Sequence, residues 1–253
     1  MSATGHGTRI IKDGLVLHID PANLTKHGSS PYKNLFGAGT ITNTDFTTVD
    51  NIFRSNASPT LGTGTSNLVF SGITLNTGSV TVQWWMKVTS EPNVDANNNW
   101  RRLIADTAGG RSPFGFVLEQ PRSINFTLQT TTGNKRYLAG SFTPYTTPLN
   151  TWEMHTFTYD KDTGVATCYQ NTTQVRSGAQ TASSDGVTGA TVAGESMVTL
   201  SSGTPMEISN STASSNGDGC LPCDLGPWLI YNKALSSYEV ERNFLCYRKR
   251  YGI

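Results

Sequence analysis

The chain has 253 residues, a formal net charge of +1 and only 15% charged residues. This balance argues against nucleic acid or an anionic membrane as the main partner, because both are held by concentrated basic surfaces. All-β sandwiches of this length commonly form one domain, so we predict a single domain over residues 1–253.

The N-terminal segment, residues 1–12, is predicted to be an arm outside the main fold. It contains no apolar h-region, and no apolar run in the chain approaches the roughly 20 residues that span a bilayer. We therefore expect neither a signal peptide nor a membrane partner.

The first predicted strand, residues 14–20, alternates Leu15, Leu17 and Ile19 with less apolar residues and ends before Pro21. Similar short segments predict further strands at residues 67–70, 78–88, 102–106, 115–118, 123–129, 136–142, 151–159, 164–171, 197–200, 206–209 and 227–231. The Gly, Pro, Asn and Asp residues between these segments are typical of an all-β, antiparallel sandwich and exclude alternating βαβ units.

Two hairpins and one unusual stretch stand out between the strands. Turn-forming residues at 159–164 and at 130–134 each separate two predicted strands. Residues 177–219 are dense in Ser, Thr and Gly and carry few large apolar side chains, so we predict long loops between edge strands. We expect neighbouring subunits to hold residues 1–12 and 177–219, because these segments bury too little apolar surface of their own.

A short C-terminal helix is predicted over residues 237–248. Ser236 and Glu239 have the spacing of a capping box, in which each side chain bonds to the other residue's backbone amide. Leu235 before the helix and Val240 within it have the spacing of a hydrophobic staple.

Four segments together resemble a known family. Residues 78–88, 152–164 and 225–244, with the opening residues 13–23, are similar to the strands and closing helix of laminin-G-like, concanavalin-type structural proteins of tailed phages. The resemblance implies a jelly-roll sandwich and a non-enzymatic virion structural protein, made in the host cytoplasm. It would be a capsid decoration or fibre-associated component that binds capsid or tail proteins or copies of itself. The alternative is a carbohydrate-binding adhesin that contacts a cell-surface glycan.

Catalytic patterns are missing from the sequence. Sandwich glucanases of similar fold carry Glu-Xaa-Asp-Xaa-Xaa-Glu on one strand, and this string does not occur. Glu239 and Glu241 are the nearest pair, but they fall on the predicted helix and point apart. His155 matches a family histidine whose commoner role is that of a satisfied strand side chain. We therefore expect no enzyme activity.

Metal and thiol chemistry are also expected to be absent, with calcium left open. Calcium is a frequent ligand in the resembling family, but aspartates that flank loops are more often turn formers. Cysteines in a chain without routing to an oxidising compartment are expected to be reduced and inert. The aspartates in question are Asp160, Asp162, Asp218 and Asp224, and the cysteines are Cys168, Cys220, Cys223 and Cys246.

Tryptophans are the candidate ligand contacts. Adjacent Trp84 and Trp85 must point to opposite faces of a sheet, so one is expected in the core and the other half-exposed or covered. Trp100 follows an Asn-rich loop at the start of a strand, and we predict that Trp100 and Arg101 bind a ligand such as a sugar. The other tryptophans, including Trp152 and Trp228, are expected to pack in the core.

Overall fold

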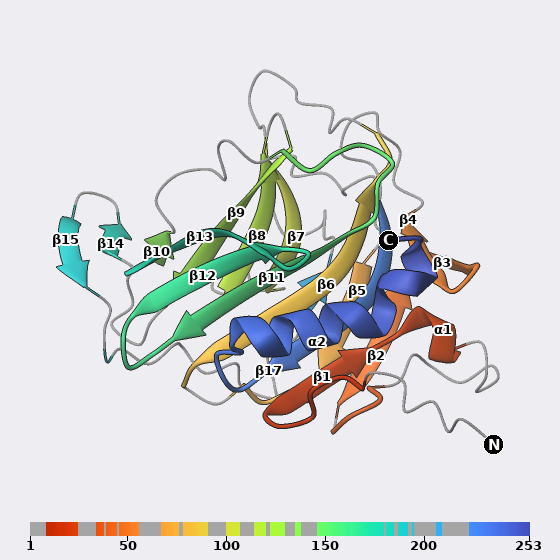
Figure 1. The fold of residues 1–253 in the computed structure, drawn as a ribbon, viewed down its shortest axis with the longest axis horizontal. Coiled ribbons are helices and arrows are strands. Elements are labelled where there is room, and N and C mark those ends of the chain that lie inside the picture. Colours follow the sequence, from red (N-terminus) through yellow and green to blue (C-terminus); the bar gives the residue numbers. More distant parts are fainter. Residues whose placement is uncertain are drawn as a thin grey trace.

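Two antiparallel sheets pack face to face, and a helix near the C-terminus lies across the outer surface of one of them (Figure 1). The computed structural model describes residues 9–24, 34–37, 39–44, 46–55, 67–75, 78–90, 100–106, 114–119, 122–129, 135–137, 146–179, 181–184, 187–191, 194, 206–208 and 223–253. The arrangement confirms the predicted all-β sandwich of jelly-roll type with its C-terminal helix.

The first sheet, sheet A, has the order β13-β12-β11-β6-β17-β4-β3, and β1 also pairs with β17. Its strands are β1 (Leu15–Ile19), β3 (Phe46–Val49), β4 (Ile52–Ser55), β6 (Val80–Val88), β11 (Glu153–Asp160), β12 (Val165–Gln170), β13 (Thr173–Ala179) and β17 (Cys223–Tyr231). Strand β6 pairs along one edge of β17, while β4 and β1 pair in succession along the other. The two ends of the chain are therefore joined within one sheet.

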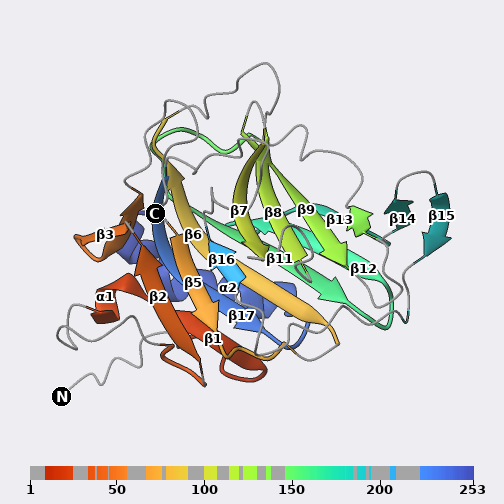
Figure 2. The ribbon, with the colours of Figure 1, turned by 180° about the vertical axis from the view of Figure 1, so that it is seen from behind.

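The second sheet, sheet B, has the order β10-β9-β8-β7-β16-β5-β2. Its strands are β2 (Thr40–Thr44), β5 (Asn67–Ser71), β7 (Trp100–Asp106), β8 (Phe114–Glu119), β9 (Ser123–Gln129), β10 (Lys135–Tyr137) and β16 (Met206–Ile208). Figure 2 views the molecule from the side of sheet B, with the C-terminal helix behind it. A separate hairpin of β14 (Thr181–Ser184) and β15 (Val187–Thr191) lies beside β10.

The space between the sheets is filled with apolar side chains. Trp84 of β6 stacks on Trp228 of β17 with ring centroids 5.3 Å apart, and Phe116 of sheet B meets Trp84 at 4.8 Å. These rings are fully buried, as are the strand residues Phe70 and Phe157 around them. Burial of this much apolar surface is the main force that holds the two sheets together.

The outer face of sheet A is covered by helix α2 (Ser237–Tyr247) and a 3-10 turn, η1 (Arg248–Tyr251). Trp84 and Trp85 point to opposite faces, as predicted, and both are fully buried. Trp85 lies beneath the helix, where its ring stacks on Phe244 at 5.5 Å. The helix therefore supplies a second core on the outer side of the sheet.

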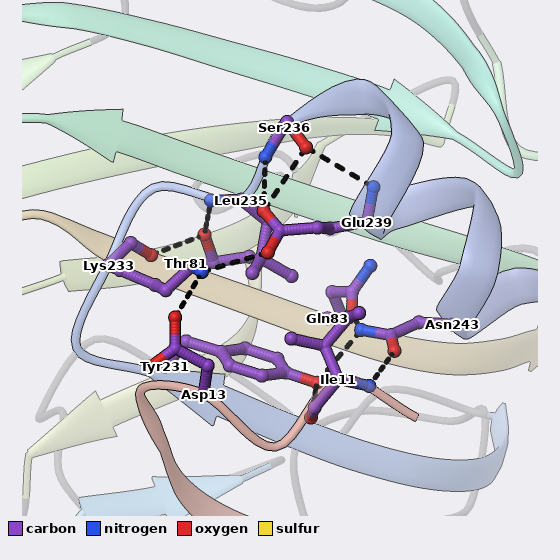
Figure 3. Close-up of polar contacts among 10 residues, drawn as sticks. All are labelled: Ile11, Asp13, Thr81, Gln83, Tyr231, Lys233, Leu235, Ser236, Glu239 and Asn243. Atoms are coloured by element: carbon purple, nitrogen blue, oxygen red, sulfur yellow. Dashed lines mark hydrogen bonds and ion pairs between the residues drawn. The ribbon is translucent and has the colours of Figure 1, made fainter. Parts of the chain in front are cut away.

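A buried polar network joins α2 to the sheet and to the N-terminal segment (Figure 3). Asn243 donates from Nδ2 to Gln83 Oε1 at 2.5 Å and contacts the Tyr231 hydroxyl at 2.8 Å. Its Oδ1 accepts from the backbone amide of Ile11 at 2.8 Å, and the Tyr231 hydroxyl donates to the Ile11 carbonyl at 3.1 Å. Asn243 therefore ties three separate parts of the chain together.

The start of α2 confirms the predicted capping box and staple. The Ser236 hydroxyl accepts from the Glu239 amide at 3.3 Å, and the Glu239 carboxylate accepts from the Ser236 amide at 2.9 Å. Leu235 and Val240 are both buried in the cluster beneath the helix. Thr81 Oγ1 also accepts from the Leu235 amide at 2.8 Å, which fixes this end of the helix on β6.

The structure corrects the predictions for residues 1–12 and 177–219. Ile11 is buried against α2, so the end of the predicted arm belongs to the sandwich itself. Within 177–219, the described residues include the end of β13 and the β14–β15 hairpin, which had been predicted as loops. Strand β16 confirms the predicted strand at 206–209. Small polar residues can occupy strands when neighbouring strands supply the hydrogen bonds. The predicted strand at 197–200 and the turn at 130–134 lie outside the described residues.

Strands β2 to β4 were missed because β2 and β3 are rich in Thr and β4 is only four residues long. The signal for the β3–β4 hairpin was the dipeptide Asp50–Asn51 between Val49 and Ile52. Both turn residues adopt positive φ angles of 50° and 63°, the backbone that a two-residue hairpin turn requires. The short helix α1 (Pro21–Leu24) was also not predicted.

Candidate functional site

One end of the sandwich collects the candidate binding residues, and we call it the loop end. It is the end where β6 finishes at Val88 and where β7, β11 and β17 begin (Figures 1 and 2). Antiparallel pairing aligns these termini, with Cys223 opposite Val88 and Glu153 opposite Met86. The ends of β6, β11 and β17 are therefore neighbours within sheet A, and the start of β7 lies at the same end in sheet B.

Three charged residues cross the outer face of sheet A at the loop end. Asp224 of β17 is paired in register with Arg54 of β4 on one side and Lys87 of β6 on the other. Its Oδ1 accepts from Arg54 Nε at 3.0 Å, and its Oδ2 lies 2.7 Å from Lys87 Nζ. The Asp224 side chain is only 2% exposed, whereas those of Arg54 and Lys87 are 49% and 23% exposed. The hydrogen bond and charge of Asp224 raise the pKa of Arg54.

An aromatic stack lies next to this charged group. Tyr251 packs against Trp85 at 4.6 Å between ring centroids and against Trp152 at 4.3 Å. Lys87 Nζ lies over the Trp152 ring, 5.4 Å from its centroid, within the range of a cation–π contact. Trp152 is only partly buried, in contrast to the core position expected for it. The stack therefore ends in a partly buried indole beside Lys87 of the charged group.

The predicted contacts Trp100 and Arg101 begin strand β7, also at the loop end. Trp100 pairs with Glu119 and Arg101 with Leu118. Successive residues of a strand lie on opposite faces of the sheet. The two residues are therefore adjacent in the strand but do not share a face. Their side chains lie outside the described part of the structure.

A polar pair on the inner face of sheet A includes His155, which was predicted to be a satisfied strand side chain. His155 stacks on Trp84 at 5.4 Å, and its Nε2 lies 3.6 Å from Glu153 Oε2. Within the described residues, that nitrogen is buried and makes no hydrogen bond. Burial lowers the pKa of His155 to about 3, which leaves the imidazole neutral near pH 7. Gln170 donates a short hydrogen bond to the other Glu153 oxygen.

The aspartates considered for calcium have other partners where the structure describes them. Asp160 Oδ1 accepts from the Asp162 amide at 3.0 Å, the geometry of a turn former, and Asp224 holds two cations. No cluster of three or more His, Cys, Asp or Glu side chains suited to a metal occurs among the described residues. Asp218 and Cys220 lie outside them.

The thiols that the structure describes are shielded to different degrees. Cys168 and Cys223 are buried, and Cys246 is half-buried on α2. None of the three forms a disulfide within the described residues. Burial raises the pKa of Cys246 to about 11, so little reactive thiolate forms near pH 7. Across the residues that the structure describes, no helix has the length and apolar character needed to cross a membrane.

The two-sheet fold and the helix that covers one outer face define a lectin-type β-sandwich. A family model described as the concanavalin A-like lectin/glucanases superfamily matches residues 62–241. The chain therefore belongs to this superfamily. A comparison with curated proteins gave no match.

Solved structures with this fold include binding domains of bacterial toxins. The ligand-binding domain of botulinum neurotoxin serotype D, in complex with N-acetylneuraminic acid, has a TM-score of 0.59 at 13% identity, covering 92% of this chain and 50% of that chain. The binding domain of Paraclostridial Mosquitocidal Protein 1 has a TM-score of 0.59 at 16% identity, covering 91% and 52%. This chain thus spans about half the length of these structures, and at such identity the likeness shows the fold alone.

Sequence reasoning missed the group formed by Trp152, Lys87, Arg54 and Asp224. Trp152 lies directly before β11, and Trp100 is the first residue of β7. This position at the start of a strand was the available signal that Trp152 is a ligand contact. The pairing of Arg54 with Asp224 had no signal, because it depends on β4, which was not predicted.

Proposed function

We propose that the protein is a non-enzymatic carbohydrate-binding protein that contacts its glycan at the loop end. The observation that carries this proposal is Trp152, a partly exposed indole beside the Arg54–Asp224–Lys87 group. Aromatic surface accommodates the C–H groups of a pyranose ring, and charged side chains supply directed hydrogen bonds to its oxygens. Binding sites in general combine apolar surface with a few placed polar groups in this way.

Several features support binding in preference to catalysis. Glycoside hydrolysis uses two carboxylates that flank the scissile bond. On the described inner face of sheet A, Glu153 is buried and bonded to Gln170, and its strand neighbour His155 is neutral near pH 7. The similar solved structures also support binding, because both are binding domains and one is in complex with N-acetylneuraminic acid.

Trp100 and Arg101 are proposed as further contacts from the other side of the loop end. Both residues lie at the start of β7, at the same end of the sandwich as Trp152. A glycan of several residues would meet Trp152 with one unit and Trp100 or Arg101 with another. Calcium is proposed as an additional ligand, although the described residues contain no group of three or more His, Cys, Asp or Glu side chains that could hold it.

The test is a glycan-array measurement with the purified protein and two variants. Trp152→Ala removes the exposed indole, and we expect it to abolish or strongly weaken every glycan signal. Tyr238→Ala is the matched control, because Tyr238 is a 65% exposed aromatic residue at the start of α2, away from the stack. Absence of any specific glycan signal for the unchanged protein would contradict the proposal, as would equal signals for the Trp152→Ala variant.

A virion structural role is the second candidate, and one observation favours it. The opening and closing segments that resemble tailed-phage proteins, residues 13–23 and 225–244, are in direct contact, since β1 pairs with β17. In that role the protein would decorate a capsid or fibre and bind capsid proteins, tail proteins or copies of itself. Copurification with intact particles at high copy number is the expected result. Consistent absence from purified particles would contradict it.

A further inference from the structure

Within the described residues, the charged group at the loop end has an excess of positive charge close to the partly exposed indole of Trp152. Arg54 and Lys87 share the single carboxylate of Asp224. Asp50, in the exposed β3–β4 turn, adds only a weaker attraction to Arg54. Since Asp224 is buried and faces both cations, an incoming ligand meets the cations and not the carboxylate.

Arg54 also has unused hydrogen-bond donors. Only its Nε donates a hydrogen bond to Asp224, and the two terminal nitrogens of the guanidinium make no hydrogen bond within the described residues. The side chain is 49% exposed, so these nitrogens can be reached from solvent. A guanidinium presents its N–H groups as a planar fork that fits a carboxylate or sulfate with two parallel bonds.

We propose that the glycan bound at the loop end is acidic, with a carboxylate or sulfate held by Arg54 and Lys87 while its sugar ring contacts Trp152. The inference rests on the proposed carbohydrate-binding function and names the ligand class for the same site. Because Asp224 binds the Nε atom of Arg54, the two terminal guanidinium nitrogens of Arg54 are directed outward. A neutral sugar would leave these donors to water and would gain less from the site.

The test compares probes that differ only in charge. Oligogalacturonate is measured against its methyl ester, and dextran sulfate against dextran, by titration calorimetry with the full chain. We expect the acidic member of at least one pair to bind about tenfold or more tightly, with an affinity that falls as salt is added. Equal affinity within both pairs would overturn the acidic-ligand inference and leave the carbohydrate-binding function standing. Failure of all four probes, together with a blank glycan array, would contradict both.

Single substitutions test whether the tighter binding of the acidic probe depends on the charged group. Arg54→Gln should lower affinity for the acidic probe about tenfold and leave the neutral probe unchanged, whereas Trp152→Ala should weaken both. Asp50→Asn should raise acidic affinity modestly, because it removes the competing negative charge. Lys161→Gln, in the β11–β12 turn at the opposite end of the sandwich, is the control for a general loss of one positive charge. An Arg54→Gln variant that binds the acidic probe like the Lys161→Gln control would overturn the inference.

Discussion

Two regions on the outer face of sheet A use the same strands in opposite ways. Beneath α2, the polar side chains of β6 and β17 meet other parts of the chain, and Asn243 bonds to Gln83 and Tyr231. At the loop end, where these strands pass beyond the helix, Lys87 and Asp224 lie beside half-exposed Arg54. The hydrogen bonds beneath α2 stabilise the fold, whereas the charged group at the loop end keeps N–H donors available for a ligand.

The largest effect is expected from breaking the covered network at Asn243. Asn243→Leu would leave the Ile11 amide and the Gln83 amide oxygen without their partner in a buried site. We expect a loss of about 3 to 5 kcal/mol in the free energy of unfolding, measured with urea. Glu241→Gln, on the exposed side of the same helix, is the control and should change stability by less than about 0.5 kcal/mol. Equal losses in the two variants would contradict the role given to the network.

Acidification should weaken the contact between β1 and the end of α2. His18 Nε2 lies 2.8 Å from the Tyr247 hydroxyl, with Asp20 and Arg250 as the charged neighbours. Burial lowers the pKa of His18 to about 4, below its unfolded value, so the unfolded chain binds the proton more readily. Stability from this residue is complete above about pH 6.5 and falls by about 3 kcal/mol as the pH drops to 4.

Urea unfolding at a series of pH values measures this effect, and buried His155 contributes in the same direction. The variant His18→Gln keeps a polar side chain but cannot titrate, so its stability should fall less steeply over the same pH interval. Identical pH profiles for the two proteins would show that His18 is not responsible.

The next effect concerns the close approach of η1 to β17. A Cβ atom at Gly226 would overlap the Tyr251 hydroxyl and crowd Trp85, so only glycine fits there. Gly226→Ala should cost about 2 kcal/mol through this overlap. Adding Tyr251→Phe removes the nearest atom and should restore part of the loss in a double-mutant cycle. Strictly additive changes would mean that the two residues do not compete for the same space.

The smallest effect is expected at the start of α2. Replacing both Ser236 and Glu239 with Ala removes the reciprocal capping bonds and the Glu239 contact with Lys233. The expected loss is about 1 to 2 kcal/mol without loss of the fold. Ser237→Ala, one residue along and exposed, serves as the control. An unchanged melting temperature in the double variant would contradict the capping interpretation.

The sequence carried enough information to predict the covered region. The spacing of Leu235, Ser236, Glu239 and Val240 predicted the helix start, and strand alternation placed Trp84 and Trp85 on opposite faces. These are local patterns, in which the residues that specify a contact lie within a few positions of one another.

The uncovered region could not be predicted in the same way. Arg54 and Asp224 are 170 positions apart and meet only because β4 pairs with β17. Strand β4 follows a Thr-rich strand and carries no alternation long enough to predict, so its partner could not be inferred. The same lack of apolar residues led the end of β13 and the β14–β15 hairpin to be predicted as loops, although neighbouring strands supply the hydrogen bonds that make them strands.

The claim that a glycan meets Trp152 is tested most directly by the indole N–H signals of the five tryptophans. In a nuclear magnetic resonance titration with oligogalacturonate, each indole reports on its own surroundings. The account predicts a saturable shift of the Trp152 signal while those of Trp84, Trp85 and Trp228, which are fully buried, stay in place. A titration in which the probe binds but the Trp152 signal does not move would contradict the account.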